Sequence, residues 1–178
     1  MELDAISAGT VQVGNASSGA ITVSAVIDAA NSQPYSHIHR PGIAVGGHCI
    51  PVYPRFLMQG NEHTVLPRAA REVNEGMPEY AVSLLGPDLH GRTVLILGVA
   101  YRGGVKETAF SGVFGAVDAL TQRGATAVVH DPLYSDDELT ALGFTPYHLG
   151  EPVDAAVVQA DHAEYRVLGI VDLPGITA

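Results

Sequence analysis

The sequence is poor in cysteine and lysine, and it has no long apolar run. Cys49 is the single cysteine of 178 residues, so no disulfide can form within the chain, which fits a reducing compartment. Lys106 is the single lysine and the formal net charge is −10, which disfavours nucleic acid and anionic membranes as partners. No basic start precedes an apolar stretch, and no apolar run reaches the length of about 18 residues typical of a membrane span. We therefore expect a cytoplasmic protein that binds neither nucleic acid nor membrane.

The residues that are present have the composition of a globular protein. Hydrophobic residues make up 47% of the chain and charged residues 16%, enough to bury a substantial core. Twenty glycines and eleven prolines indicate many turns and close approaches of the backbone. The negative charge leaves room for a small anionic ligand, because one or two arginines and a helix N-terminus can hold it.

We expect an irregular segment over residues 1–23 and a helical segment over residues 24–90. In the first, "TVQV" and "AITV" are candidate short strands among glycine, serine and asparagine. In the second, "SAVIDAANSQPY" predicts a short helix, followed by a glycine-rich loop around Cys49. Pro67 and Pro78 are each expected to begin a further helix, because proline suits a first helical turn.

Residues 91–178 alternate between strand and helix patterns. "TVLILGVA", "TAVVHD" and "DAAVVQA" are apolar runs of strand length, "SDDE" predicts a helix cap, and "DHAEYRVL" predicts a last helix. This alternation favours right-handed crossovers and a parallel sheet. We expect an α/β protein with a helical connector segment followed by a Rossmann-like parallel-sheet domain. One face of the helix after the first strand is marked by Phe110, Val113, Phe114, Val117 and Leu120, with Gly124 closing it.

The turn after the first of these strands reads "GVAYRGG", residues 98–104. Open α/β sheets bind ligands beyond the carboxyl ends of their strands, so Tyr101 and Arg102 are well placed for binding. The spacing is not G-x-G-x-x-G, so the turn carries no dinucleotide fingerprint. Two interpretations stay open: a tight turn that binds nothing, or a mononucleotide site in which Arg102 faces a phosphate or a sugar.

Cys49 stands in the stretch "PGIAVGGHCIP". A lone cysteine is most often a small buried hydrophobic residue. Here, however, Gly46 and Gly47 would let a ligand approach the main chain, and their N–H groups could stabilise a developing oxyanion. His48 adjoins the thiol in sequence.

Three histidines, at positions 37, 39 and 48, lie in this part of the chain. The sequence has no second cysteine, no H-E-x-x-H motif and no helical pair of histidines. We therefore expect no metal site.

Several stretches, taken in order, resemble one enzyme family. "PGIAVGGHCIPVYP" looks like the catalytic-cysteine motif of the UDP-glucose/GDP-mannose dehydrogenase family, and "AREVNEGMP" resembles the helix after it. "VLILGVAYRGGVKET", "VVHDP" and "DAAVVQADHAEY" resemble successive pieces of the family's C-terminal nucleotide-sugar-binding domain. The histidine before the cysteine is similar to the branch that oxidises UDP-N-acetylmannosamine or UDP-N-acetylglucosamine. The similarity covers roughly residues 24 to 175.

The resemblance implies an oxidation of a sugar CH₂OH group to a carboxylate in two NAD⁺-dependent hydride transfers. In the family a cysteine captures the aldehyde as a thiohemiacetal and then carries a thioester, so the resemblance implies this role for Cys49. It implies catalytic positions at His48 and Tyr53 as well. It further implies a UDP-N-acetylhexosamine as substrate, with UDP-N-acetylmannosamine as first candidate, and a homodimer through residues 24–88. The implied substrate-binding residues are Arg40, Gly42, Gly46, Gly47, Tyr101 and Arg102.

Several features depart from the family pattern. Nothing resembles the family's N-terminal NAD-binding domain, so NAD would be bound mainly outside this chain. Tyr53 stands where the family has an aspartate that helps to activate water, Arg102 where it has a lysine, and "KETA" at 106–109 replaces another acidic motif. We therefore interpret the chain as the C-terminal part of an NAD-dependent UDP-sugar dehydrogenase, inactive by itself.

Two other interpretations compete with this one. The chain could be a non-catalytic module for UDP-sugar binding or dimerisation. It could also be a cysteine hydrolase using Cys49 and His48, although the sequence identifies no residue to orient the histidine.

Overall fold

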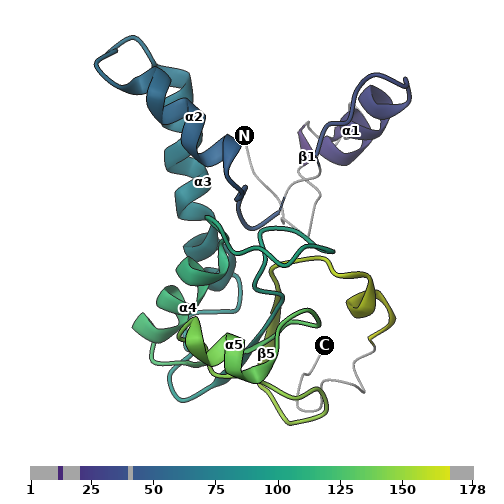
Figure 1. The fold of residues 1–178 in the computed structure, drawn as a ribbon, viewed down its shortest axis with the longest axis vertical. Coiled ribbons are helices and arrows are strands. Elements are labelled where there is room, and N and C mark those ends of the chain that lie inside the picture. Colours follow the sequence, from purple (N-terminus) through teal and green to yellow (C-terminus); the bar gives the residue numbers. More distant parts are fainter. Residues whose placement is uncertain (1–11, 14–20, 40–41, 169–178) are drawn as a thin grey trace. The chain divides into compact units, whose positions relative to one another are not determined.

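The computed structural model describes residues 12–13, 21–39 and 42–168. Contacts divide the chain into two units, residues 1–42 and residues 43–178 (Figure 1). The division expected from the sequence, at residues 23 and 90, stays a prediction.

The described residues of the first unit form a short antiparallel pair and one helix. Strand β1 (Gln12–Val13) pairs with β2 (Ile21–Thr22), and α1 (Val23–Asn31) follows directly. The side chain of Asn31 closes the next turn, because it donates to the carbonyl oxygen of Ile38 at 2.9 Å and accepts from its N–H at 2.7 Å. The expected short strands and short helix are confirmed.

The second unit is built on a three-stranded parallel sheet. Its strands are β3 (Thr93–Leu97), β4 (Thr126–His130) and β5 (Ala155–Val158), in the order β4-β3-β5. This arrangement confirms the predicted α/β class and parallel sheet. The carboxyl ends of all three strands therefore meet at one edge, where ligands bind in open α/β sheets.

The central strand β3 is covered on both faces, which explains its continuous apolar sequence. Val94 and Ile96 belong to a core shared with α4 (Val113–Gln122), while Leu95 and Leu97 belong to a core on the opposite face. All four side chains are almost completely buried. The residues buried around Leu95 and Leu97 are Tyr147, Val153 and Tyr165.

The helix α4 differs in two respects from its predicted apolar face. Phe114 is 39% exposed, with its ring centroid 5.3 Å from that of Phe144, so it is not among the buried residues of the helix. Phe110 lies before the helix, has a φ of +52° and is exposed, so it is not part of that face. The buried side of α4 includes two alanines that the pattern of large residues overlooked. Small side chains there let neighbouring helices approach closely. The buried residues of α4 are Val113, Ala116, Ala119 and Leu120.

The helix α3 (Val65–Ser83) is continuous, so the prediction of two helices separated at Pro78 was wrong. A proline inside a helix removes one backbone hydrogen bond and favours a break. Pro78 is nevertheless buried, and it packs against α4 at Gly115, where a Cβ atom would lie 3.0 Å from the Cβ of Pro78. Tertiary packing on α4 thus offsets the local cost.

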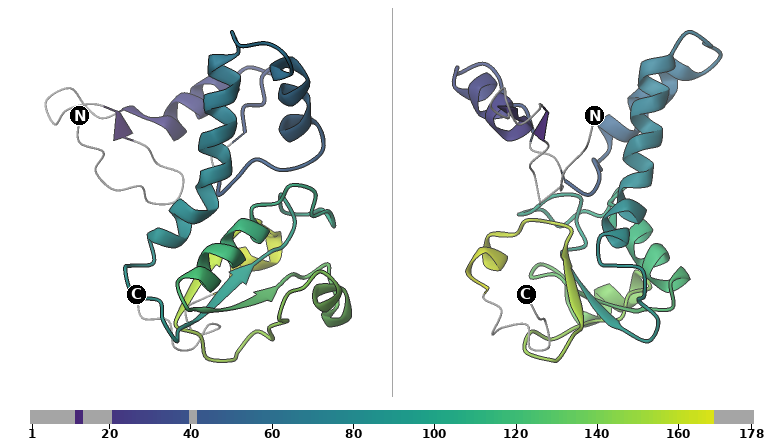
Figure 2. Two further views of the ribbon diagram at one scale, coloured as in Figure 1. Left: turned by 90° about the vertical axis from the view of Figure 1, so that its left-hand side faces the viewer. Right: turned by 180° about the vertical axis from the view of Figure 1, so that it is seen from behind.

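The helix α2 (Cys49–Met58) was not expected, because the sequence around it was interpreted as a loop. Pro51 lies in its first turn, where a missing N–H removes no helical bond, while Pro54 lies further in. Helices α2 and α3 lie side by side (Figure 2). Arg55 of α2 donates to Glu75 of α3 at 3.0 Å across the pair.

Two short elements complete the second unit. Helix α5 (Asp136–Ala141) begins with the predicted capping box, in which Ser135 and Glu138 satisfy each other's backbone N–H groups. The segment η1 (Ala163–Val167), within the stretch predicted as the last helix, is a 3₁₀-helix. Within the described residues, no helix is both long and apolar enough to cross a membrane.

Candidate functional site

Cys49 is the first residue of α2, and it is exposed. We call residues 46–49 the cysteine loop. Gly47 has a φ of +86°, in the left-handed region that favours glycine, and its N–H donates to the carbonyl oxygen of Ala109 at 2.8 Å. One of the N–H groups expected to face an oxyanion is therefore already occupied. The first N–H groups of a helix have no acceptor within it, so those of Cys49 and Ile50 are the better candidates.

The cysteine loop packs against the turn at residues 98–104, which we call the β3 turn. A Cβ atom on Gly46 would lie 2.5 Å from the Cβ of Tyr101 and 2.7 Å from the carbonyl oxygen of Phe110. A Cβ atom on Gly47 would lie 3.4 Å from the ring of Tyr101. Only glycine fits at position 46, and the two segments singled out in the sequence lie together in the fold.

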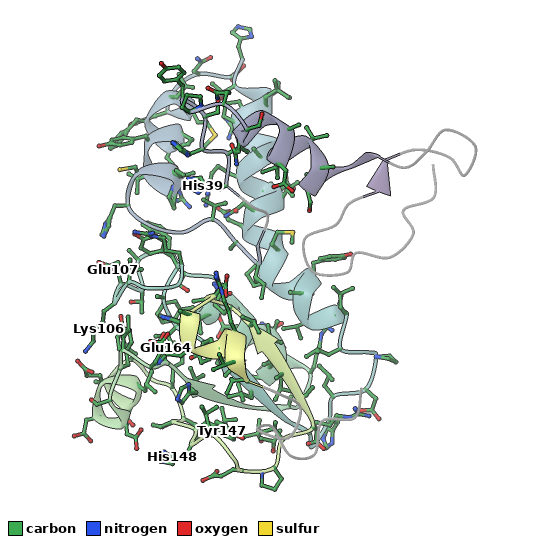
Figure 3. The ribbon with its side chains drawn as sticks, turned by 90° about the vertical axis from the view of Figure 1, so that its right-hand side faces the viewer. His39, Lys106, Glu107, Tyr147, His148 and Glu164 are labelled. Carbon is green, nitrogen blue, oxygen red and sulfur yellow. The ribbon has the colours of Figure 1, made fainter. Side chains whose placement is uncertain are left out.

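His48 faces an acidic residue that sequence reasoning overlooked. Its Nε2 lies 3.2 Å from Oε2 of Glu107. Glu107 lies on the loop between β3 and α4, next to Lys106 (Figure 3). The other oxygen of Glu107 accepts the N–H of Ala109 at 2.9 Å. That N–H, and then the His48 side chain, hold the pKa of the Glu107 carboxyl below its ordinary value. Glu107 therefore stays ionised and orients the imidazole.

The cysteine and the histidine do not form a nucleophile–base pair in this structure. Among the hydrogen bonds of the described residues, none joins the Sγ atom of Cys49 to His48, whose Nε2 is directed to Glu107. A hydrolase of the cysteine–histidine type needs that contact, so its geometry is not formed here.

Tyr53 follows Cys49 by four residues on α2, so both lie on the same face of the helix, about one turn apart. The Tyr53 side chain is 64% exposed, and its ring centroid lies 6.3 Å from that of Phe56. The phenol thus lies on the same helix face as the thiol and in contact with solvent.

Glycines in the β3 turn let it pass close to the segment after β5. Gly98 has a φ of +88°, and a Cβ atom there would lie 2.5 Å from the Cβ of Ala160. A Cβ atom on Gly103 would lie 1.9 Å from the carbonyl oxygen of Asp161. Arg102 between them is exposed, and within the described chain it has neither an ion pair nor a side-chain hydrogen bond. Its guanidinium is free to meet an anion.

The remaining expected positions fall elsewhere. Arg40 lies outside the described residues. Gly42 is exposed, and a Cβ atom there would meet nothing within 4 Å. In the described part of the chain, no cluster of histidine, cysteine, aspartate and glutamate could hold a metal ion.

Sequence reasoning also overlooked two buried polar residues, Asp131 and His162. Both lie in motifs already quoted, "VVHDP" and "QADHAEY", directly after β4 and just after β5. The sequence did contain a signal for them: each is a polar residue that follows an apolar strand, and the carboxyl ends of the strands form the edge of the sheet that carries the β3 turn.

Comparisons with known proteins agree with this architecture. The pattern of the UDP-glucose/GDP-mannose dehydrogenase family, UDP binding domain, matches residues 95–176. The pattern of the same family's central domain matches residues 15–76. The chain belongs to this family. The central-domain match includes Cys49, and the UDP-binding-domain match includes most of the parallel sheet.

Among its relatives is the UDP-N-acetyl-D-mannosamine dehydrogenase of Pyrococcus horikoshii, 33% identical over 82% of this chain and 36% of the relative. The UDP-N-acetyl-D-glucosamine 6-dehydrogenase of Pseudomonas aeruginosa is 30% identical over 84% of this chain and 38% of the relative. A solved structure of the Pyrococcus horikoshii UDP-D-ManNAc dehydrogenase aligns with a TM-score of 0.60 at 30% identity, covering 81% of this chain and 35% of that one. The chain thus spans little more than a third of the length of these family members.

Proposed function

We propose that this chain is the cysteine-bearing and UDP-sugar-binding part of a UDP-N-acetylhexosamine 6-dehydrogenase, with UDP-N-acetylmannosamine as the first candidate substrate. The observation that carries the proposal is the packing of the cysteine loop on the β3 turn through Gly46 and Tyr101. A nucleotide held at the β3 turn would extend its sugar toward the exposed Cys49.

The β3 turn has the features of a site for the diphosphate or ribose. It lies at the carboxyl edge of a parallel sheet, and Arg102 is exposed there without an acidic partner among the described residues. The chain as a whole is acidic, with a net charge of −10, so an exposed guanidinium without an acidic partner is the feature that would attract an anion.

Cys49 is proposed to act as the nucleophile. Its sulfur would add to the C6 aldehyde of the bound sugar: the S–C6 bond forms as the C=O π bond opens, and the proton lost by the thiol ends on the former carbonyl oxygen. The N–H groups of Cys49 and Ile50, in the first turn of α2, would stabilise the oxygen as it becomes negative. Since Gly47 donates to Ala109, it is not assigned this role.

Hydrolysis of the later thioester needs a base other than Tyr53, since a phenol is a poor proton acceptor at neutral pH in comparison with a carboxylate. His48 is the proposed substitute. It precedes the thiol, and Glu107 holds its Nε2 at 3.2 Å, leaving Nδ1 to accept a proton from water.

NAD is proposed to bind mainly outside this chain. The residues present do not fit a dinucleotide, because the β3 turn reads "GVAYRGG" and the sequence contains no G-x-G-x-x-G. No hydride-transfer step is therefore assigned to any residue here.

Calorimetry with UDP, UDP-N-acetylglucosamine and NAD⁺ tests the proposal. We expect both uridine nucleotides to bind and NAD⁺ to bind far more weakly. Arg102→Gln should weaken UDP binding about tenfold, the usual effect of losing one charge-assisted hydrogen bond. Arg92→Gln is the matched control, because Arg92 is exposed before the opposite end of β3. Preferential binding of NAD⁺ would contradict the assignment.

A non-catalytic UDP-sugar-binding module is the second candidate. It is favoured by Tyr53, which replaces the expected aspartate on the cysteine-bearing face of α2. UDP binding without any covalent reaction at Cys49 would identify this function.

We also propose a homodimer through the helical segment, residues 24–88. Leu66 and Val73 on α3 are 82% and 66% exposed, and Leu84, the residue that caps the C-terminal end of α3, is 57% exposed. Exposed apolar side chains grouped on one helix are typical of a surface that another protein covers.

A further inference from the structure

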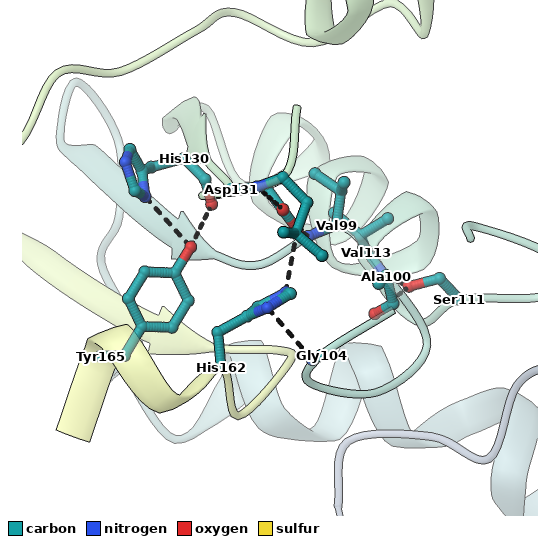
Figure 4. A network of polar contacts seen from close by, with 10 residues as sticks. Val99, Ala100, Gly104, Ser111, Val113, His130, Asp131, His162 and Tyr165 are labelled. Atoms are coloured by element: carbon teal, nitrogen blue, oxygen red, sulfur yellow. Dashed lines mark hydrogen bonds and ion pairs between the residues drawn. The ribbon is translucent and has the colours of Figure 1, made fainter. Parts of the chain in front are cut away.

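Two polar residues, His162 and Asp131, are buried beside the β3 turn. The side chains are 1% and 0% exposed, respectively. Nδ1 of His162 accepts the N–H of Gly104 at 3.2 Å, and its Nε2 lies 3.2 Å from Oδ2 of Asp131 (Figure 4). The histidine therefore connects the last residue of the turn to a strand-end carboxylate.

The contact with Gly104 determines where the proton of a neutral His162 ring lies. A backbone N–H only donates, so Nδ1 must present its lone pair and the proton must be on Nε2. Nε2 is close to Asp131 but has no well-directed hydrogen bond to it, so that contact is mainly electrostatic. The directed contact is the one to the turn.

Asp131 holds the beginning of the same turn. Its Oδ2 accepts the N–H of Val99 at 2.8 Å, directly after Gly98, and its Oδ1 accepts the N–H of Leu133 at 2.9 Å. Asp131 and His162 thus fix the two ends of the β3 turn, one from the end of β4 and the other from the segment after β5.

A second pair stiffens the surroundings of His162. The hydroxyl of Tyr165 donates to the carbonyl oxygen of His130 at 2.8 Å, and it lies 3.0 Å from Nδ1 of the same residue. The ring of Tyr165 meets the ring of His162 edge to face, with centroids 5.6 Å apart. Burial raises the pKa of the Tyr165 phenol, which keeps its proton for donation. His162 therefore has little freedom to turn.

The buried pair of His162 and Asp131 fixes the geometry of the β3 turn rather than stabilising the fold. Burying a charged or polar pair costs free energy that an apolar side chain of similar volume would avoid. What the pair adds is direction, since each N–H at the two ends of the turn has one fixed acceptor. Between those ends lie Tyr101, which supports the cysteine loop, and Arg102, which is exposed.

We propose that His162 is a positioning residue, which holds the β3 turn in the shape that presents Tyr101 and Arg102 to the uridine diphosphate group. This inference rests on the proposed function. His162 does not touch the ligand itself, because it is buried beneath the turn.

Two variants separate the directed contact from the volume of the ring. In His162→Asn the amide oxygen can take the position of Nδ1 and accept from Gly104. In His162→Gln the longer side chain reaches toward Asp131 and leaves Gly104 without its acceptor. His148→Asn is the control, because His148 is an exposed surface histidine paired with Asp136.

UDP affinity is measured by calorimetry for the parent and the variants. We expect His162→Asn and His148→Asn to bind within about threefold of the parent, and His162→Gln to bind about tenfold more weakly, as for one lost hydrogen bond. If His162→Asn and His162→Gln bind UDP with equal affinity, whether unchanged or equally weakened, the inference about His162 is overturned while the proposed function stands. A parent that does not bind UDP overturns the proposed function and this inference with it.

Nitrogen-15 spectra of the parent keep the inference testable if a variant fails to fold. We expect Nδ1 of His162 to be the unprotonated nitrogen, and the Gly104 amide to exchange slowly with solvent and to shift when UDP is added. A protonated Nδ1 or a rapidly exchanging Gly104 amide overturns it.

Discussion

Replacing Gly46 with alanine should disrupt the junction between the cysteine loop and the β3 turn. The added Cβ atom would lie 2.5 Å from the Cβ of Tyr101 and 2.7 Å from the carbonyl oxygen of Phe110. Carbon atoms in contact are normally about 3.5–4.0 Å apart, so the two segments must separate by about 1 Å or more. One of the atoms is backbone, so no rotation of a side chain relieves the clash.

The expected cost of Gly46→Ala is about 1–3 kcal/mol of unfolding free energy, the range for overpacking a filled site. For a chain of this length that lowers the midpoint of thermal unfolding by several degrees. UDP affinity should fall as well, because Tyr101 belongs to the β3 turn. Thermal unfolding and calorimetry measure the two effects.

Gly76→Ala is the matched control for this variant. Gly76 lies within α3, and a Cβ atom there would meet nothing within 4 Å. Alanine is the better helix former by about 1 kcal/mol, so this variant should be more stable than the parent. If Gly46→Ala also gained stability and kept full UDP affinity, the described junction would be refuted.

Three further predictions concern charge, acyl transfer and assembly. The Lys106 ammonium holds the pKa of the Glu138 carboxyl at about 2. In Lys106→Gln an NMR titration should show that pKa rising toward its ordinary value. Any stability that the pair contributes is present above the ordinary pKa of the carboxyl and is lost as the pH falls toward 2. An acetyl group placed on Cys49 by p-nitrophenyl acetate should be hydrolysed roughly tenfold more slowly in His48→Ala than in the parent, measured by intact mass, and an equal rate would exclude His48 as the base. The chain should sediment as a dimer at micromolar concentration, and Val73→Glu should shift it toward monomer; a monomeric parent would contradict the homodimer.

The sheet was predictable because each strand is encoded locally. β3 is apolar at every buried position since it is covered on both faces, and the capping box at Ser135 requires only neighbouring residues. The helix α3 was not predictable in the same way. Its continuity through Pro78 depends on Gly115, a residue of another helix, and no local pattern reports that contact.

The residues of the candidate site likewise fall into those that a local sequence pattern reveals and those that it does not. Cys49 and the glycines of its loop stood out in the sequence because a single cysteine follows a glycine-rich stretch. Glu107 and His162 did not, because each gains its role from a partner far along the chain: His48 in one case and Gly104 in the other. Such pairings become visible only when the sheet brings its strand ends together.

Cys49 and the β3 turn are proposed to form one site, and a labelled aldehyde tests this most directly. The measurement is the carbon-13 spectrum of a UDP-N-acetylhexosamine 6-aldehyde, labelled at C6, in the presence of the chain. We expect a thiohemiacetal signal that is absent with Cys49→Ala and that disappears when excess UDP is added. If the adduct failed to form in a chain that binds UDP, or formed but resisted competition by UDP, thiol and nucleotide would not share a site.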